Sequence, residues 1–198
     1  MKKRQFVAAS VFGAAAAALP RATHAQHAPA NARGPTLLTV SGLIGAGNRG
    51  ALDPALDQMM AKQKLAFAKA YAFDFAALMA LPAVTINPTL EYDSRPHALK
   101  GPLLADVMKA CGVTVGDKTA YLLRAVDGYA VLLSAAEANQ RRFIVATHLD
   151  GQPMALGGLG PLWTVFDADR FADMVAKPVT ERFSLCPWAT YSIDVKAV

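Results

Sequence analysis

Two Asp-Gly pairs, Asp127-Gly128 and Asp150-Gly151, separate runs of apolar residues in the second half of the chain. Asp-Gly supplies the positive φ values that a tight hairpin turn needs, and the flanking runs are rich in Val, Ile, Leu and Tyr. Each pair therefore predicts a β-hairpin. We expect residues 121–167 to form successive antiparallel strands, around which the rest of the chain must fold.

Shorter signals predict further elements on both sides of the hairpins. Asp53-Pro54 is an N-cap followed by proline at the first helical position, and Ser134 with Glu137 forms a capping box. Pro88 interrupts a strand pattern, which indicates an edge strand. The expected helices are 54–71, 74–81, 103–110, 134–139 and 169–175, and the expected outer strands are 36–44, 84–92 and 188–195. Because helices and strands do not alternate regularly, the pattern predicts an α+β fold with short helices and a mixed, mostly antiparallel sheet.

Residues 1–25 have the features of a secretory signal peptide. A basic start that includes Lys2, Lys3 and Arg4 precedes an Ala-rich apolar run and a stretch of small residues that ends at Ala25. We expect cleavage after Ala25 and export to the bacterial periplasm. The alternative, a buried Ala-rich helix, does not explain the basic start at the extreme terminus.

The remaining chain is expected to form a single domain. Residues 26–35 are rich in Pro and Ala and predict a disordered linker, and residues 36–198 are enough for one domain with its own core. Removal of residues 1–25 takes away four of the 20 basic residues and none of the 15 acidic ones, which leaves a net charge of +1. This charge gives no indication of nucleic acid binding, and no other segment is long and apolar enough to span a membrane.

The two cysteines, Cys111 and Cys186, have two interpretations. An oxidising compartment would permit a disulfide between them. Cys111, however, continues the apolar face of the expected helix 103–110, which favours a buried free thiol.

A glycine-rich segment also has two interpretations. Gly45, Gly47 and Gly50 match the Gly-x-Gly-x-x-Gly pattern of a dinucleotide-binding loop, with Asp74 at a suitable distance. Pro54 delays the helix that should begin inside this pattern, and the region around Asp74 is itself helical in character. A loop without nucleotide is therefore the favoured interpretation.

Several short motifs follow one another in the second half of the chain. They are Gly101-Pro-Leu-Leu-Ala-Asp, Arg124-Ala-Val-Asp-Gly-Tyr, Leu149-Asp-Gly-Gln-Pro-Met, Gly160-Pro-Leu-Trp and Pro187-Trp188. In this order they resemble the pterin-binding domain of the sulfite oxidase-like molybdopterin oxidoreductases. The resemblance covers about residues 80–198 and implies the sulfite oxidase-type pterin-binding fold.

The chain departs from the catalytic members of that family at two points. The family holds molybdenum through a Cys thiolate ahead of the Gly-Pro-Leu helix, and residues 82–92 of this chain contain no cysteine. The arginine of the family's Pro-Leu-Arg turn is replaced by Trp163. The chain is therefore most similar to small exported pterin-binding members. In that branch the ligand-bound protein is thought to report to a membrane-bound cyclic-di-GMP enzyme, and the resemblance implies such a partner here.

The resemblance assigns a ligand-binding role to five residues. Trp163 would stack on a pterin ring, Asp127 or Glu91 would accept hydrogen bonds from the 2-amino-pyrimidinone edge, and Arg124 would donate to its carbonyl, with Tyr129 as a further contact. Alternative roles remain open. Trp163 could fill the core, and Arg124 could form a structural ion pair with Asp127 or Glu91.

The function itself has alternatives. The first hypothesis is a non-catalytic pterin-binding protein; the alternative is a molybdopterin-dependent oxidoreductase without a cysteine ligand, and a third is an interaction module with an empty pocket. No catalytic residue is expected, because capping explains Ser134 and Glu137. His97 and His148 have no partner at ligand spacing and predict no metal site. Trp188 is interpreted as a core or rim residue.

Overall fold

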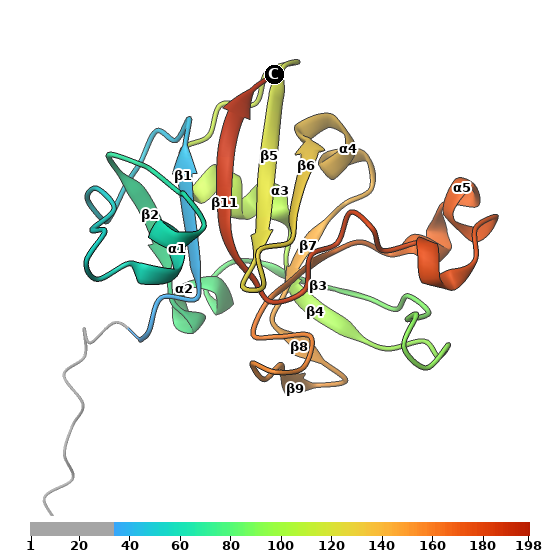
Figure 1. Cartoon of the computed structure of the whole chain (residues 1–198). Helices are drawn as coiled ribbons and strands as arrows, with labels where there is room; N and C mark the ends of the chain where they lie inside the picture. Colours follow the sequence, from blue (N-terminus) through green and yellow to red (C-terminus); the bar gives the residue numbers. More distant parts are fainter. Residues whose placement is uncertain (1–33) are drawn as a thin grey trace, which may run out of the picture. The chain divides into compact units, whose positions relative to one another are not determined.

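The structure, a computed structural model, describes residues 34–198 (Figure 1). The predicted signal peptide, its cleavage after Ala25 and almost all of the predicted linker lie outside the described residues. No helix within residues 34–198 combines the length and the apolar character needed to cross a membrane.

A five-stranded sheet forms the larger part of the fold. Its strands lie in the order β2 (Ala70–Phe73), β1 (Leu38–Gly42), β11 (Thr190–Ala197), β5 (Thr119–Ala125) and β6 (Ala130–Ser134). β1 and β11 are parallel, and the other neighbours are antiparallel. Figure 1 shows β1, β11, β5 and β6 side by side. The predicted turn at Asp127-Gly128 joins β5 to β6, which confirms the first hairpin.

One face of this sheet forms the core with two helices. Val40, Ile193 and Leu123 occupy neighbouring positions across three strands, and all three are fully buried. The helices α3 (Leu104–Ala110) and α4 (Ala135–Gln140) add apolar side chains to the same cluster. Removal of this apolar face from water is the main interaction that stabilises the fold.

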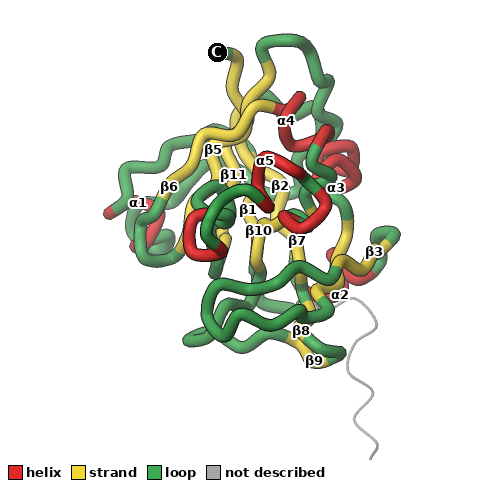
Figure 2. The backbone as a smooth tube through the Cα atoms, turned by 90° about the vertical axis from the view of Figure 1, so that its right-hand side faces the viewer, coloured by secondary structure: helices red, strands yellow, loops and turns green. Residues whose placement is uncertain are grey.

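The other strands form two smaller sheets. A four-stranded sheet has the order β3 (Ala83–Ile86), β4 (Leu99–Pro102), β8 (His148–Leu149) and β9 (Gln152–Pro153), and β7 (Ile144–Ala146) pairs with β10 (Trp163–Val165). Asp150-Gly151 forms the turn between β8 and β9, and β3 lies at a sheet edge, as predicted. Figure 2 shows short helices distributed around the strands. The predicted α+β class, with mixed, mostly antiparallel sheets and short helices, is confirmed.

Gly101 permits a close approach between β4 and β7. A Cβ atom at this position would lie 1.9 Å from the carbonyl oxygen of Val145. Since any side chain would force the two strands apart, the glycine of the Gly-Pro-Leu motif has a packing role in this fold.

The short helices begin where capping residues predicted them. The Asp74 carboxylate accepts a hydrogen bond from the Ala77 N–H at 2.8 Å and begins α2 (Phe75–Met79). The Ser134 hydroxyl accepts from the Glu137 N–H at 3.1 Å and begins α4. The expected helix 169–175 is instead divided into the 3-10 turn η1 (Ala168–Arg170) and α5 (Ala172–Val175).

The long helix predicted for residues 54–71 is wrong. Only α1 (Gln58–Lys62) is helical, and residues 70–73 form β2. Leu56 is 83% exposed and no residue of α1 is buried. A helix gains most of its stability from a buried apolar face, and this segment has none. Pairing with β1 therefore determines the conformation of its last residues.

The cysteines and the glycine-rich segment follow the favoured interpretations. Cys111 and Cys186 are both buried free thiols, and burial raises the pKa of Cys111 to about 12. Gly45 lies in a loop and donates its N–H to the Gly112 carbonyl at 3.1 Å. Asp74 caps a helix instead of ending a parallel strand, so the segment is not a dinucleotide-binding loop.

Candidate functional site

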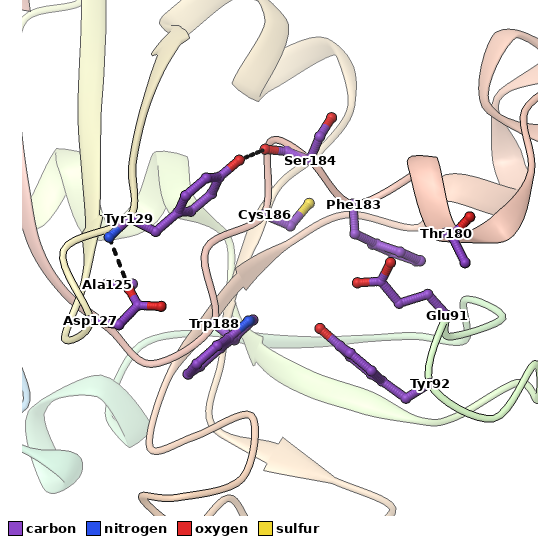
Figure 3. Close-up of a pocket in the computed structure, with 10 residues that line it drawn as sticks. All are labelled: Glu91, Tyr92, Ala125, Asp127, Tyr129, Thr180, Phe183, Ser184, Cys186 and Trp188. Carbon is purple, nitrogen blue, oxygen red and sulfur yellow. Dashed lines mark hydrogen bonds between the residues drawn. The ribbon is translucent and has the colours of Figure 1, made fainter.

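A cavity of about 270 Å³ opens between three segments of the chain (Figure 3). These are the loop of residues 88–97 after β3, the turn between β5 and β6, and the segment from η2 (Val179–Glu181) to β11. The side chains that line it are Glu91, Tyr92, Ala125, Asp127, Tyr129, Thr180, Phe183, Ser184, Cys186 and Trp188. Rings and carboxylates therefore meet in one small space.

Asp169 joins two walls of this cavity. One of its carboxylate oxygens accepts the Thr89 N–H at 2.7 Å, and the other accepts from the Arg182 guanidinium at 2.9 Å. Thr89 lies near the start of the loop of residues 88–97, and Arg182 precedes Phe183 in the opposite segment. The two walls are thus held at a fixed separation by one side chain.

The third wall is the turn between β5 and β6. Asp127 Oδ1 accepts the Tyr129 N–H at 2.9 Å, which closes the turn, and the Tyr129 hydroxyl donates to the Ser184 carbonyl at 2.7 Å. Asp127 Oδ2 has no hydrogen bond among the contacts of residues 34–198. The fixed carboxylate can therefore accept hydrogen bonds from a ligand.

Two partly exposed rings and a second carboxylate face the same space. Trp188, Tyr92 and Glu91 line the cavity, and Figure 3 shows the Glu91 carboxylate pointing into it. Burial, followed by a hydrogen bond to Glu91, raises the pKa of Tyr92 to about 12. Tyr92 therefore remains a neutral phenol at physiological pH and can donate to Glu91.

Cys186 lies in the wall of the cavity with only 3% of its surface exposed. Burial raises the pKa of its thiol well above the usual range. The protonated thiol is a poor metal ligand, because metals bind the thiolate. Within the described residues, no group of three or more His, Cys, Asp or Glu side chains could hold a metal ion.

Comparisons with known proteins leave the family open. No protein-family model matches the chain. No curated protein matches it either. The resemblance to the sulfite oxidase-like pterin-binding domain thus stays a prediction that rests on its motifs.

The prediction that Trp163 is a stacking surface is wrong. Its indole is completely buried, its Nε1–H donates to the Cys186 carbonyl at 2.9 Å, and its ring centroid lies 5.7 Å from that of Phe183. The alternative, a core residue, is correct. Because Cys186 and Phe183 line the cavity, Trp163 supports the cavity wall from behind.

Arg124, the other residue that the resemblance assigned to the ligand, does not line this cavity. Ala125 lines the cavity, and successive residues of a strand point to opposite faces. Arg124 therefore lies on the other face of the five-stranded sheet, opposite Ser192 in β11. The ion pairs found within residues 34–198 include none between Arg124 and Asp127 or Glu91.

Three of the predicted residues do come together. Asp127, Glu91 and Tyr129 all line the cavity, although Glu91 is distant in the sequence from the turn that contains the other two. The sequence analysis missed Tyr92 and assigned Trp188 to the core or rim. Two signals could have identified them, since Tyr92 follows Glu91 directly and Trp188 belongs to the last of the resembling motifs.

A histidine between two carboxylates stabilises the loop of residues 88–97. His97 Nδ1 lies 2.6 Å from Asp150 Oδ2, and Nε2 lies 2.9 Å from Asp93 Oδ2. The hydrogen bond to Asp150, followed by that to Asp93, raises the pKa of His97 above 6.5. Since the folded pKa exceeds the unfolded one, this stabilisation is complete below the unfolded pKa and is lost as pH rises through the folded pKa.

We therefore expect His97→Gln to lower the free energy of unfolding more at about pH 6 than at about pH 8.5. Urea denaturation at both pH values measures this difference. Asp150→Asn is the matched variant, because asparagine tolerates the φ of 49° at this position and replaces the charged carboxylate by a neutral amide of the same shape. An equal effect of His97→Gln at both pH values would contradict the ion pair.

Proposed function

We propose that this protein is a non-catalytic pterin-binding protein, exported to the periplasm, and that the cavity of about 270 Å³ is its ligand site. The proposal rests on one observation: two partly exposed aromatic rings and two carboxylates line the same small cavity. Ligand sites commonly combine apolar or aromatic walls with a few fixed polar groups. A flat heterocycle with several N–H donors fits that combination.

The polar groups favour a ligand with an amino-pyrimidinone edge. Such an edge presents neighbouring N–H donors, and a carboxylate can accept two of them at once. Asp127 is the best candidate, because one of its oxygens is fixed by Tyr129 while the other is unpaired in the part of the chain that is described. Glu91 also lines the cavity, so we assign it to a second polar contact.

The rings favour a ligand that is flat. Trp188 is 37% exposed and Tyr92 is 57% exposed, both at the cavity. An indole face stacks well on a heterocycle, and its polar edge can stay near water. The motif resemblance adds support, since Asp127 and Trp188 each belong to one of its motifs. From the same resemblance we propose that a membrane-bound cyclic-di-GMP enzyme recognises the ligand-bound form of this protein.

One observation bears on the alternative, a molybdopterin-dependent oxidoreductase. Cys186 is a cysteine in the cavity wall, which the sequence analysis did not anticipate. Its thiol is almost completely buried and its pKa is raised by that burial. A metal would have to expose and deprotonate it, so this cysteine supports metal binding less well than the rings and carboxylates support a simple pterin.

A pair of matched ligands tests the proposed recognition. Unsubstituted pterin carries a 2-amino group, whereas lumazine has a carbonyl at that position and would place an acceptor against the Asp127 carboxylate. We expect titration followed by ligand fluorescence to show tighter binding of pterin. Equal affinity for the two ligands would contradict recognition of the amino-pyrimidinone edge by a carboxylate.

We expect Asp127→Asn to weaken pterin binding about tenfold, because the variant loses a hydrogen bond to a charged group. Asp117→Asn is the control, since Asp117 is exposed and does not line the cavity. The same titration measures both variants. Unchanged affinity in Asp127→Asn would exclude this carboxylate from the ligand site.

A further inference from the structure

A second cavity, of about 230 Å³, lies between β3, the connection from α4 to β7, and the segment that contains η1 and α5. It shares no lining residue with the cavity that contains Trp188. Three arginines line it, Arg141, Arg142 and Arg170, together with a single carboxylate, Asp167. The lining therefore carries an excess of positive charge.

Arg141 is fixed in this cavity by several contacts. Its Nε donates to Glu137 at 3.0 Å and its Nη2 donates to Asp173 at 2.8 Å. The guanidinium also lies over the rings of Phe166 and Phe171, at 5.2 and 5.3 Å from their centroids. The side chain is only 15% exposed, and its Nη1 is buried without a hydrogen-bond partner in the described chain. A fixed, unused donor thus remains on a rigid guanidinium.

Asp167 presents the complementary group. Its Oδ1 is also buried and has no hydrogen-bond partner among the described residues. Buried polar atoms without a partner are rare, and each one calls for a bound group or water that satisfies it. Arg141 needs an acceptor, and Asp167 needs a donor. Arg142 and Arg170 are exposed, form no ion pair within residues 34–198, and add positive charge at the entrance.

Arg142 also has an unfavourable backbone conformation. Its φ is 53°, directly after α4, where its N–H donates to the Asn139 carbonyl at 3.1 Å. Glycine is the preferred residue at such a helix end, because a Cβ atom destabilises the left-handed conformation. The chain has an arginine there, and this residue lines the cavity together with Arg141 and Arg170.

We propose that this cavity binds hydrogen phosphate. Phosphate oxygens accept from the unused Arg141 donor and are neutralised by Arg142 and Arg170, in the way that guanidinium groups bind phosphate. The remaining P–O–H donates to Asp167. Sulfate has the same shape and similar charge but no O–H at neutral pH, so it leaves the Asp167 carboxylate facing an acceptor.

Isothermal titration calorimetry on the full-length chain at about pH 6.5, where phosphate keeps a proton, tests the proposal with inorganic phosphate as the probe. We expect phosphate to bind at least about tenfold more tightly than sulfate at equal ionic strength, because an unmatched acceptor facing a carboxylate is costly. Absence of phosphate binding, or equal binding of sulfate, would overturn the proposal. Binding to vesicles that contain phosphatidic acid, without binding to free phosphate, would also overturn it.

The variant Arg142→Gly distinguishes an effect on phosphate binding from an effect on stability. The variant should raise Tm by a few degrees, because glycine relieves the left-handed conformation, and it should weaken phosphate binding about tenfold through the lost charge. Lys64→Gly is the matched control: Lys64 follows α1 with a φ of 60° and does not line the cavity. It should also raise Tm, with unchanged phosphate affinity. Phosphate affinity that stays at the wild-type value in Arg142→Gly would contradict the site.

Asp167→Asn tests the origin of the selectivity. An amide can donate to sulfate, so the variant should bind phosphate and sulfate with similar affinity. Retention of the wild-type preference for phosphate in this variant would show that Asp167 does not accept the phosphate proton, and the assigned geometry would be wrong.

Discussion

Trp163→Ala is expected to lower the free energy of unfolding by about 3–5 kcal/mol, as large-to-small substitutions of buried aromatic residues do. The indole is completely buried, and its loss leaves a cavity beside Phe183. It also removes the hydrogen bond to the Cys186 carbonyl at 2.9 Å, which leaves that carbonyl without its partner. Urea denaturation followed by circular dichroism measures the change.

Trp163→Phe is the comparison for that measurement. It keeps most of the packing but removes the indole N–H, so its effect on the free energy of unfolding should be smaller than that of Trp163→Ala. A stability close to the wild-type value for Trp163→Ala would contradict the burial of this ring. It would also restore Trp163 as a possible ligand surface.

Trp188→Ala is expected to weaken pterin binding roughly 10- to 100-fold, which is the range that loss of one stacked aromatic ring produces. The same variant should lower the free energy of unfolding less than Trp163→Ala does, because part of the Trp188 ring is exposed whereas Trp163 is completely buried. Trp188 lines the cavity and is 37% exposed, so its ring is accessible to a ligand. Fluorescence titration with pterin measures the affinity.

Two variants make this result specific to the ring. Trp188→Phe keeps a smaller aromatic face and should bind pterin with intermediate affinity. Leu132→Ala removes an apolar side chain that is 53% exposed and lies outside the cavity, so it should bind like the wild type. If Trp188→Ala binds pterin as tightly as the wild type does, the ring does not form the stacking surface.

The two hairpins and the caps were predictable because their signals are local. Asp127-Gly128 and Asp150-Gly151 determine their turns through backbone φ values, and Ser134 caps α4 through a hydrogen bond three residues away. None of these depends on distant parts of the chain. The same local rules predicted a helix over residues 54–71, where no buried face stabilises one.

The residues of the site could not be predicted in the same way, because they depend on packing between segments that are distant in the sequence. Trp163 and Trp188 are both preceded by apolar or proline residues, yet one is completely buried and the other is 37% exposed. Arg124 and Ala125 are neighbours, and only the strand register determines which of them faces the cavity. The sequence therefore identified Asp127 and Glu91, which line the cavity, but could not show which of the two tryptophans lies beside them.

The central claim is that the cavity beside Trp188 and Asp127 binds a simple pterin. The most direct test is to purify the protein from a host that makes both pterins and molybdopterin, release any bound small molecule with acid, and identify it by mass spectrometry with a molybdenum assay on the same sample. We expect a simple pterin without molybdenum, and its loss from Trp188→Ala. Molybdopterin with stoichiometric molybdenum, or no pterin at all, would contradict the account.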